Sequence, residues 1–287
     1  MADVHAAVRG LRSALLTIRR PPFARPGHFY SPLTAPADTE RAVEWTGLDP
    51  VGVDLRANQQ LGLVAGLVSM MAGYRPDRWH AGNGQYDTAD AAVLHAMLRK
   101  LRPGRIIEVG SGYSTAVMLD TIEQFDVPTS VTCIEPYPQR LLSRLRGGER
   151  VELRQVAAQE IPLADFDQLA PGDVLFIDST HVLKPGSDVA WLYLHVLPRL
   201  QPGVIVHIHD TFWPFEYPEY WLRQRRDWTE LYLLRAMLTG TTMWQIELFS
   251  SWVWREHPEL IPEQLRRPAP GSIWLRKTAS HDQQPVR

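Results

Sequence analysis

The sequence contains a single cysteine, Cys133, among its 287 residues. One thiol excludes an intrachain disulfide and a cysteine-ligated metal cluster, and its place within an apolar run favours a buried structural thiol. No apolar stretch approaches the length of about 18 residues that a membrane span requires. We therefore expect a cytoplasmic protein with no membrane partner.

The chain also lacks an excess of charge of either sign. It has 30 Lys and Arg residues against 32 Asp and Glu residues, which gives a formal net charge of −2 at pH 7. This balance does not favour nucleic acid or an anionic membrane as a partner. Residues 1–20 are rich in arginine, but Asp3 and the missing cleavage-site pattern favour an amphipathic helix over a targeting segment.

A glycine-rich turn at residues 110–112 lacks two features of common nucleotide-binding loops. Thr115 stands where a dinucleotide fingerprint has its third glycine, and the chain has no GKS or GKT phosphate loop. An apolar run with Ile106 and Ile107 precedes the turn, and a helical pattern follows it from Ala116. Strand, glycine turn and helix together bring backbone N–H groups close to a nucleotide-like ligand, here without a pyrophosphate to bind.

Apolar runs and helical patterns alternate along the second half of the chain, which predicts an α/β fold with a doubly wound parallel sheet. We expect strands near residues 105–109, 130–135, 150–156, 172–178 and 203–209, and two more at 242–249 and 271–277. Helices are expected at 88–100, 114–124, 138–145 and 187–198, with a short one near 163–169.

The N-terminal part has a different character. Residues 21–54 contain six prolines and predict an irregular arm, whereas residues 58–73 are apolar at too many positions for a solvated helix. We interpret the latter as a buried or lid helix. The sequence thus predicts a helical and irregular arm over residues 1–75 and one α/β domain over residues 76–287.

Acids and histidines stand where three predicted strands end. Glu135 closes the second strand, one βα unit after the glycine turn, where a carboxylate can accept hydrogen bonds from both hydroxyls of a ribose. Asp178 closes the fourth strand and His181 follows three residues later, while His209 and Asp210 end the fifth. The carboxyl edge of a parallel sheet is where ligands bind in doubly wound folds, so these side chains are candidate site residues.

Over about residues 27–250 the chain resembles a bacterial group of class I S-adenosylmethionine (SAM) methyltransferases with an N-terminal arm. The resemblance is carried by segments 28–32, 52–55, 105–115, 134–138, 176–181, 207–210 and 214–218. It implies a Rossmann-like sheet that ends in an antiparallel strand, and SAM as cofactor. The implied cofactor-binding residues are Glu108, Gly110, Ser111, Gly112, Tyr113, Ser114, Glu135, Pro136 and Tyr137.

Metal-dependent O-methyltransferases similar to catechol O-methyltransferase bind a divalent cation through an acid at the position of Asp178. Their base is a lysine three residues further on, where this chain has His181, whose ordinary pKa of about 6.5 suits removal of a hydroxyl proton. Asp178, His209 and Asp210 are predicted to form a mixed nitrogen and oxygen site for Mg²⁺, Mn²⁺, Fe²⁺ or Zn²⁺. A metal-free site, in which the histidines orient the substrate, remains the alternative.

The resemblance predicts methyl transfer from SAM to a small molecule, with an oxygen of a sugar or natural product as acceptor. Asp178 and His181 are the predicted catalytic residues. Two other classes stay open: a metal-dependent oxygenase on the same scaffold and a non-catalytic SAM-binding protein. The aromatic residues between 212 and 221 are expected to form a shaped loop that serves as a substrate wall or as a surface for a homo-oligomer.

Overall fold

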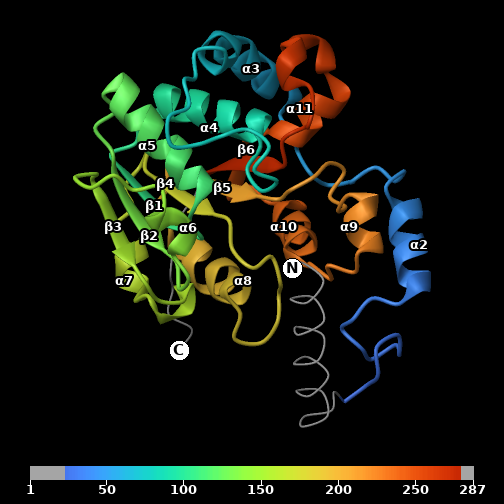
Figure 1. Ribbon diagram of the computed structural model, residues 1–287. Helices are drawn as coiled ribbons and strands as arrows, with labels where there is room; N and C mark the ends of the chain where they lie inside the picture. The colour runs from blue at the N-terminus through green and yellow to red at the C-terminus, as the bar shows by residue number, and fades with distance from the viewer. Residues whose placement is uncertain (1–22, 279–287) are drawn as a thin grey trace, which may run out of the picture. The chain divides into compact units, whose positions relative to one another are not determined.

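The computed structural model describes residues 23–278, and these form two compact units (Figure 1). The described part of the smaller unit comprises residues 23–47 and 218–227, and the larger unit comprises residues 48–217 and 228–278. The predicted helix over residues 1–20 lies outside the described residues. Among the helices that are described, none is long and apolar enough to cross a membrane.

The larger unit is built on one sheet of seven strands in the order β3-β2-β1-β4-β5-β7-β6. Strands β1 to β5 are parallel, and β7 runs antiparallel to both of its neighbours. The strand bounds are Arg105–Val109 (β1), Ser130–Ile134 (β2), Val151–Arg154 (β3), Val174–Ile177 (β4), Ile205–His209 (β5), Trp244–Phe249 (β6) and Ser272–Lys277 (β7). All seven predicted strands, including the final antiparallel one, are confirmed.

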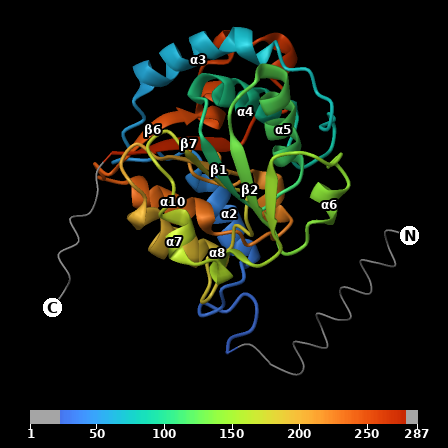
Figure 2. The same ribbon diagram turned by 90° about the vertical axis from the view of Figure 1, so that its left-hand side faces the viewer.

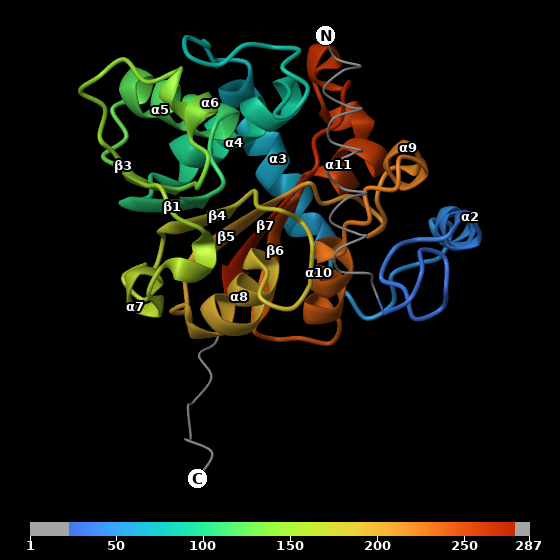
Figure 3. The ribbon, with the colours of Figure 1, turned by 60° about the horizontal axis from the view of Figure 1, so that its bottom comes forward.

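Helices cover both faces of this sheet. Figure 1 shows α4 and α5 on one face and α7 and α8 on the other, and Figures 2 and 3 show the same two layers from other sides. The long helices are α3 (Ala57–Met71), α4 (Thr88–Leu101), α5 (Tyr113–Phe125), α10 (Glu230–Leu238) and α11 (Ser250–Glu256). The short ones are α6 (Gln139–Leu142), α7 (Leu163–Phe166), α8 (Asp188–Trp191) and the 3₁₀ turns η1 (Ala158–Glu160), η4 (Pro258–Leu260) and η5 (Glu263–Leu265).

Local sequence explains where these elements begin and end. The Asp87 side chain caps α4 by accepting a hydrogen bond from the Thr88 N–H at 2.8 Å. Every residue of β4 and β5 is buried, as expected for central parallel strands covered on both faces. The predicted helix at 187–198 is broken, because Pro198 offers no N–H. After α8 it continues as a π-helical turn, η2 (Leu192–Val196), and a 3₁₀ turn, η3 (Leu197–Arg199).

The smaller unit contains α2 (Pro36–Trp45) and α9 (Glu219–Arg223), which contact each other. Arg223 pairs with Glu40 at 2.8 Å, and the Thr34 N–H donates to the Asp227 carboxylate at 3.0 Å. A segment that follows β5 thus joins the N-terminal arm. The aromatic run is correspondingly divided, because Tyr220 and Trp221 lie in α9 and not in a loop.

Helix α3 belongs to the larger unit, where it packs on α4 and β6. The buried Gln60 side chain fixes it there by accepting a hydrogen bond from the Phe249 N–H at 2.6 Å. The division after residue 47 therefore differs from the predicted division after residue 75. Val64, Leu67 and Met71 of this helix are buried in the larger unit, as the buried alternative of the prediction requires.

Candidate functional site

The strand order reverses between β1 and β4, and the glycine turn lies at this switch point. The Gly110 N–H donates to the Ile134 carbonyl of β2 at 3.0 Å, and the Asp178 N–H donates to the Val109 carbonyl at 2.9 Å. Gly110 has a φ of +82°, which favours glycine. The turn is thus held against the ends of both neighbouring strands, where ligands bind in doubly wound folds.

Thr115 explains how the loop is supported without a third glycine. Its hydroxyl accepts the Gly112 N–H at 3.0 Å and donates to Glu108 Oε2 at 2.5 Å. The Ser114 hydroxyl donates to Glu108 Oε1, also at 2.5 Å, and the Cys133 thiol donates to Oε2 at 3.2 Å. Burial raises the pKa of Glu108 to about 7, against the opposing effect of these hydrogen bonds. Glu108 is fully buried and shapes the glycine turn from behind.

A cavity of about 340 Å³ opens in front of the turn, a volume suited to a small cofactor. Apolar side chains and the acids Glu135, Asp178 and Asp188 line it, which suits an aromatic base and a ribose. Its lining residues are Val109, Gly110, Ile134, Glu135, Pro136, Tyr137, Ala157, Ala158, Gln159, Asp178, Ser179, Thr180, Lys184, Gly186, Ser187 and Asp188.

Glu135 lies at the end of β2, between the glycine turn and the following segment. Its carboxylate accepts the Ser111 N–H at 3.2 Å and the Tyr137 N–H at 2.8 Å. The carboxylate therefore has a fixed place at the cavity, with lone pairs left for hydroxyl donors. The residues of the cavity fit the ribose and base of a nucleoside cofactor.

The predicted cofactor residues separate into two groups in the structure. Gly110, Glu135, Pro136 and Tyr137 line the cavity, whereas the remaining five, Glu108, Ser111, Gly112, Tyr113 and Ser114, do not. Sequence reasoning missed the segments 157–159 and 184–188, which complete the lining. Residues 157–159 follow β3, so the rule that ligands bind beyond the carboxyl ends of the strands would have found them.

A cluster of acids and histidines adjoins this cavity through Asp178. His181 Nε2 lies 3.5 Å from Asp178 Oδ1 and 3.3 Å from Asp210 Oδ2. His209 Nδ1 lies 3.3 Å from Asp178 Oδ1 and 3.7 Å from Asp210 Oδ1. Each carboxylate therefore contacts both imidazoles. The structure brings together all four residues that the sequence proposed for catalysis and metal binding.

The mutual charges alter how these groups titrate. Burial opposes the imidazolium form of His181, but hydrogen bonds to Asp178 and Glu230 and the charge of Asp210 raise its pKa to about 10. Burial raises the pKa of Asp210 to about 6, although the nearby histidines oppose the shift. Burial alone would raise the pKa of Asp178, yet His209 and His181 hold it below its usual value. Although burial opposes the shift, Asp210 and Asp178 also raise the pKa of His209, so both histidines favour the imidazolium form beside these carboxylates.

Three of these residues have the geometry of a cation site. Asp178, His181 and Asp210 each offer a ligand atom, and the three atoms lie within 4.8 Å of one another. This set contains His181 in place of the predicted His209. Two carboxylate oxygens and one imidazole nitrogen suit Mn²⁺, Fe²⁺ or Zn²⁺, and the carboxylates also suit Mg²⁺.

Two residues that the sequence did not single out complete the surroundings of His181. Glu230, at the start of α10, has an oxygen 2.8 Å from His181 Nδ1. The Trp228 ring lies 4.5 Å from the imidazole, measured between ring centroids. Because Glu230 is 49 residues away in sequence and sits in an ordinary helical pattern, no local motif identifies it.

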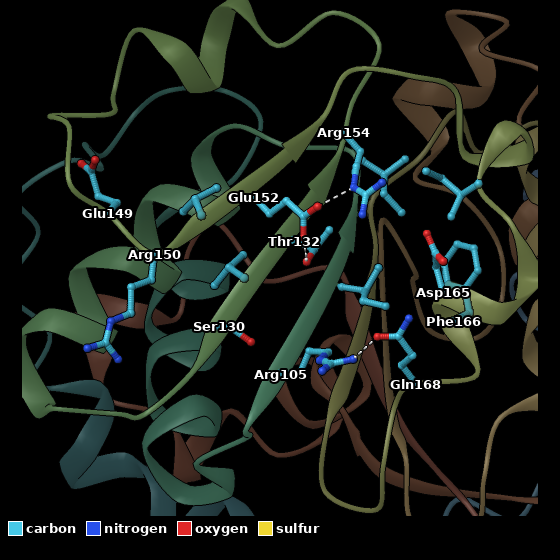
Figure 4. Close-up of a pocket in the computed structure, with 15 residues that line it drawn as sticks. Arg105, Ser130, Thr132, Glu149, Arg150, Glu152, Arg154, Asp165, Phe166 and Gln168 are labelled. Atoms are coloured by element: carbon cyan, nitrogen blue, oxygen red, sulfur yellow. Dashed lines mark hydrogen bonds and ion pairs between the residues drawn. The ribbon is translucent and has the colours of Figure 1, made fainter.

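A larger cavity of about 430 Å³ lies elsewhere, over β1, β2, β3 and α7 (Figure 4). Glu152 pairs there with Arg154, and Arg105 donates to Gln168 at 2.8 Å. None of the predicted site residues lines it. The candidate site is therefore the smaller cavity with its adjoining cluster.

Comparison with known proteins gives several matches. An uncharacterised protein of Archaeoglobus fulgidus is 29% identical over 160 residues, which cover 50% of this chain and 72% of that protein. SAM-bound TomG, an O-methyltransferase of Streptomyces achromogenes, matches with 18% identity and a TM-score of 0.43, over 84% of this chain and 96% of that chain. The Mg–SAM structure of CmcI matches with 20% identity and a TM-score of 0.40, over 68% and 73%.

The family described as "Methyltransferase domain" matches residues 107–211. This range begins in β1, includes the glycine turn and Glu135, and ends just after Asp210. The seven-stranded sheet, with its antiparallel β7 between β5 and β6, provides the matching architecture. Residues 107–211 are therefore similar to a methyltransferase domain, and they contain the glycine turn, Glu135 and the acidic cluster of the candidate site.

Proposed function

We propose that this protein transfers the methyl group of SAM to a hydroxyl oxygen of a small molecule, with a divalent cation at the acidic cluster. The observation that carries the proposal is the double position of Asp178. It lines the cofactor cavity together with Gly110, and its carboxylate also contacts His181 and His209. A cofactor in the cavity and an acceptor at the cluster would thus be neighbours.

The reaction needs alignment and a deprotonated acceptor more than covalent help. The acceptor oxygen forms a bond to the methyl carbon while the carbon–sulfur bond breaks, and the electron pair stays on sulfur. The hydroxyl proton must leave. Without a cation, Nε2 of a neutral His181, between the carboxylates of Asp178 and Asp210, could accept it. With a cation on that nitrogen, the proton would pass to solvent water.

A cation at Asp178, His181 and Asp210 would supply a positive charge that lowers the pKa of an acceptor hydroxyl. Protons and metal ions compete for such ligands, so a cation would replace the proton that His181 carries in the free protein. His181 serves either as a cation ligand or, without a cation, as the group that exchanges the acceptor proton. His209 also contacts the carboxylates of Asp178 and Asp210. It would serve either as a further cation ligand or as a group that orients the two carboxylates.

Incubation with methyl-labelled SAM and a panel of hydroxyl, amino and carbon acceptors tests the proposal. We expect label in an oxygen-bound methyl group, identified by mass spectrometry and NMR of the product. Transfer only to nitrogen or carbon would reject the oxygen acceptor. Binding of SAM without transfer to any acceptor class would favour a non-catalytic SAM-binding protein.

A second candidate is a metal-dependent oxygenase, because two imidazoles and a carboxylate are the ligand types of non-haem iron oxygenases. His181 Nε2 and His209 Nδ1 both lie within 3.5 Å of Asp178 Oδ1. Oxygen consumption with Fe²⁺ and no methyl transfer would support this alternative. Methyl transfer under anaerobic conditions would reject it.

A further inference from the structure

The start of helix α10 is bonded to the segment that carries His181. The His181 carbonyl accepts the N–H groups of Thr229 at 2.9 Å and Glu230 at 3.1 Å. The Thr229 hydroxyl in turn accepts the Leu183 N–H at 2.7 Å. The first N–H groups of a helix have no partner within the helix, and here the backbone of His181 supplies one. The segment around His181 and the first turn of α10 therefore hold each other in place.

This attachment maintains an unusual backbone conformation. His181 has a φ of +60°, in the left-handed region, which costs a residue with a Cβ atom on the order of 1 kcal/mol. Such a conformation persists only where the surroundings enforce it. The bonds to α10 and the ring of Trp228, 4.5 Å from the imidazole, provide that enforcement. The direction in which the His181 side chain leaves the backbone is thereby fixed.

The side chain of Glu230 fixes the remaining freedom, which is the rotation of the imidazole ring. Its Oε2 lies 2.8 Å from His181 Nδ1, and Glu230 is only 1% exposed. A carboxylate accepts hydrogen bonds, so Nδ1 carries the hydrogen that it receives. The other nitrogen, Nε2, is then directed at Asp178 and Asp210. A ring turned by half a rotation would present a carbon atom to Glu230 and lose this bond.

We propose that Glu230 is a positioning residue that holds His181 with Nδ1–H toward α10 and Nε2 toward the Asp178–Asp210 pair. The inference deepens the proposed function, on which the catalytic use of Nε2 rests. In zinc and related sites, carboxylate partners of this kind fix the tautomer and ring orientation of a histidine, and their loss costs about 10- to 100-fold in affinity or activity. We expect an effect of that size here.

NMR of the ring N–H protons of His181 tests the proposal in the protein without SAM or acceptor. We expect a proton on Nδ1 that is protected from exchange with water, assigned by its loss in His181→Gln. It should persist in Glu230→Gln, whose amide oxygen still accepts, and disappear in Glu230→Ala and in Glu230→Met. Methionine fills the volume without an acceptor and provides a second variant if the alanine variant unfolds.

The matched control is Glu216→Ala. Glu216 is another nearly buried acid of the larger unit, and it accepts from the Tyr232 hydroxyl at 2.6 Å and the Tyr217 N–H at 2.8 Å. This variant should keep the His181 ring proton. Turnover in Glu230→Met should fall about 10- to 100-fold with unchanged SAM affinity, and Glu230→Gln should restore most of it. A protected Nδ1 proton in Glu230→Met, or an equal loss of turnover in Glu216→Ala, would overturn the inference. If the wild type transfers no methyl group, the proposed function fails, while the ring proton still decides the role of Glu230.

Discussion

The carbonyl oxygen of Asp178 lies 1.8 Å from the point that a Cβ atom on Gly110 would occupy. Strands β1 and β4 can approach this closely at their ends only because residue 110 has no side chain. The contact also joins the two halves of the site, since Gly110 begins the cofactor loop and Asp178 begins the acidic cluster. Disturbing it should affect both.

Gly110→Ala should lower the free energy of unfolding by about 3 kcal/mol or more, because overpacking adds to backbone strain. Chemical denaturation measures the change. Gly172→Ala is the matched control, since its φ is +92° but no atom lies within 4 Å of the added carbon. It should cost only about 1–2 kcal/mol, from strain alone. Equal losses in the two variants would show that the approach to Asp178 is unimportant.

Glu135→Ala should weaken SAM binding by roughly tenfold or more, because a charge-assisted hydrogen bond contributes about 1.5–3 kcal/mol. Isothermal calorimetry with SAM gives the dissociation constant. Glu152→Ala serves as control, since Glu152 is an exposed acid of β3 that pairs with Arg154 and does not line the proposed cofactor cavity. Unchanged affinity in Glu135→Ala would place the ribose elsewhere.

His181→Ala should slow methyl transfer by about 10²–10⁴, the usual effect of losing a positioned acid or base. SAM affinity should stay nearly the same, because His181 does not line the cofactor cavity. His195→Ala, which removes an exposed imidazole from η2, should leave turnover unchanged. Full activity in His181→Ala would reject a catalytic role for this side chain.

Removal of divalent cations should abolish turnover. Dialysis against EDTA, followed by assays with Mg²⁺, Mn²⁺ or Fe²⁺ added back, measures the requirement. Asp210→Asn should raise the cation concentration needed for half-maximal activity by at least about tenfold, because it removes a carboxylate ligand. Asp165→Asn, in the other cavity, should not. Activity that survives chelation would leave Asp178 and Asp210 as direct substrate contacts.

Acid should destabilise the fold through the buried His95 of α4, whose Nδ1 lies 2.9 Å from the Thr121 hydroxyl of α5. Burial lowers its pKa to about 4, below its unfolded value of about 6.5. The unfolded chain therefore binds more protons between these values, so stability is complete above pH 6.5 and falls as the pH decreases toward 4. The loss is up to about 3 kcal/mol. Urea unfolding of the wild type and of His95→Gln at pH 7 and pH 4.5 isolates the contribution of His95. The wild type should lose more unfolding free energy between the two pH values than the variant, and an equal loss in both would contradict the prediction.

The sheet could be predicted because its determinants are local. Apolar runs such as 174–177, the Pro-Gly turns before β1, β4 and β5, and the alternation with helical patterns each depend on neighbouring residues. The strand-end rule likewise brought Asp178, His181, His209 and Asp210 together. Glu230 could not be found in this way, because its role depends on packing between elements far apart in sequence. The role of Glu108 was also hidden, since a strand-end acid can point into a core as well as toward a ligand.

Residues 218–227 form the second segment of the smaller unit. Residues 218–227 leave the larger unit after Tyr217 and return at Trp228, and the rings of these two residues are only 6.0 Å apart. A chain that departs and returns at adjacent positions can be shortened or exchanged at small entropic cost, because the ends to be joined are already close. Residues 218–227 are therefore a segment that can be replaced. A short glycine-containing linker between Tyr217 and Trp228 should still allow the seven-stranded sheet and its cavity to fold.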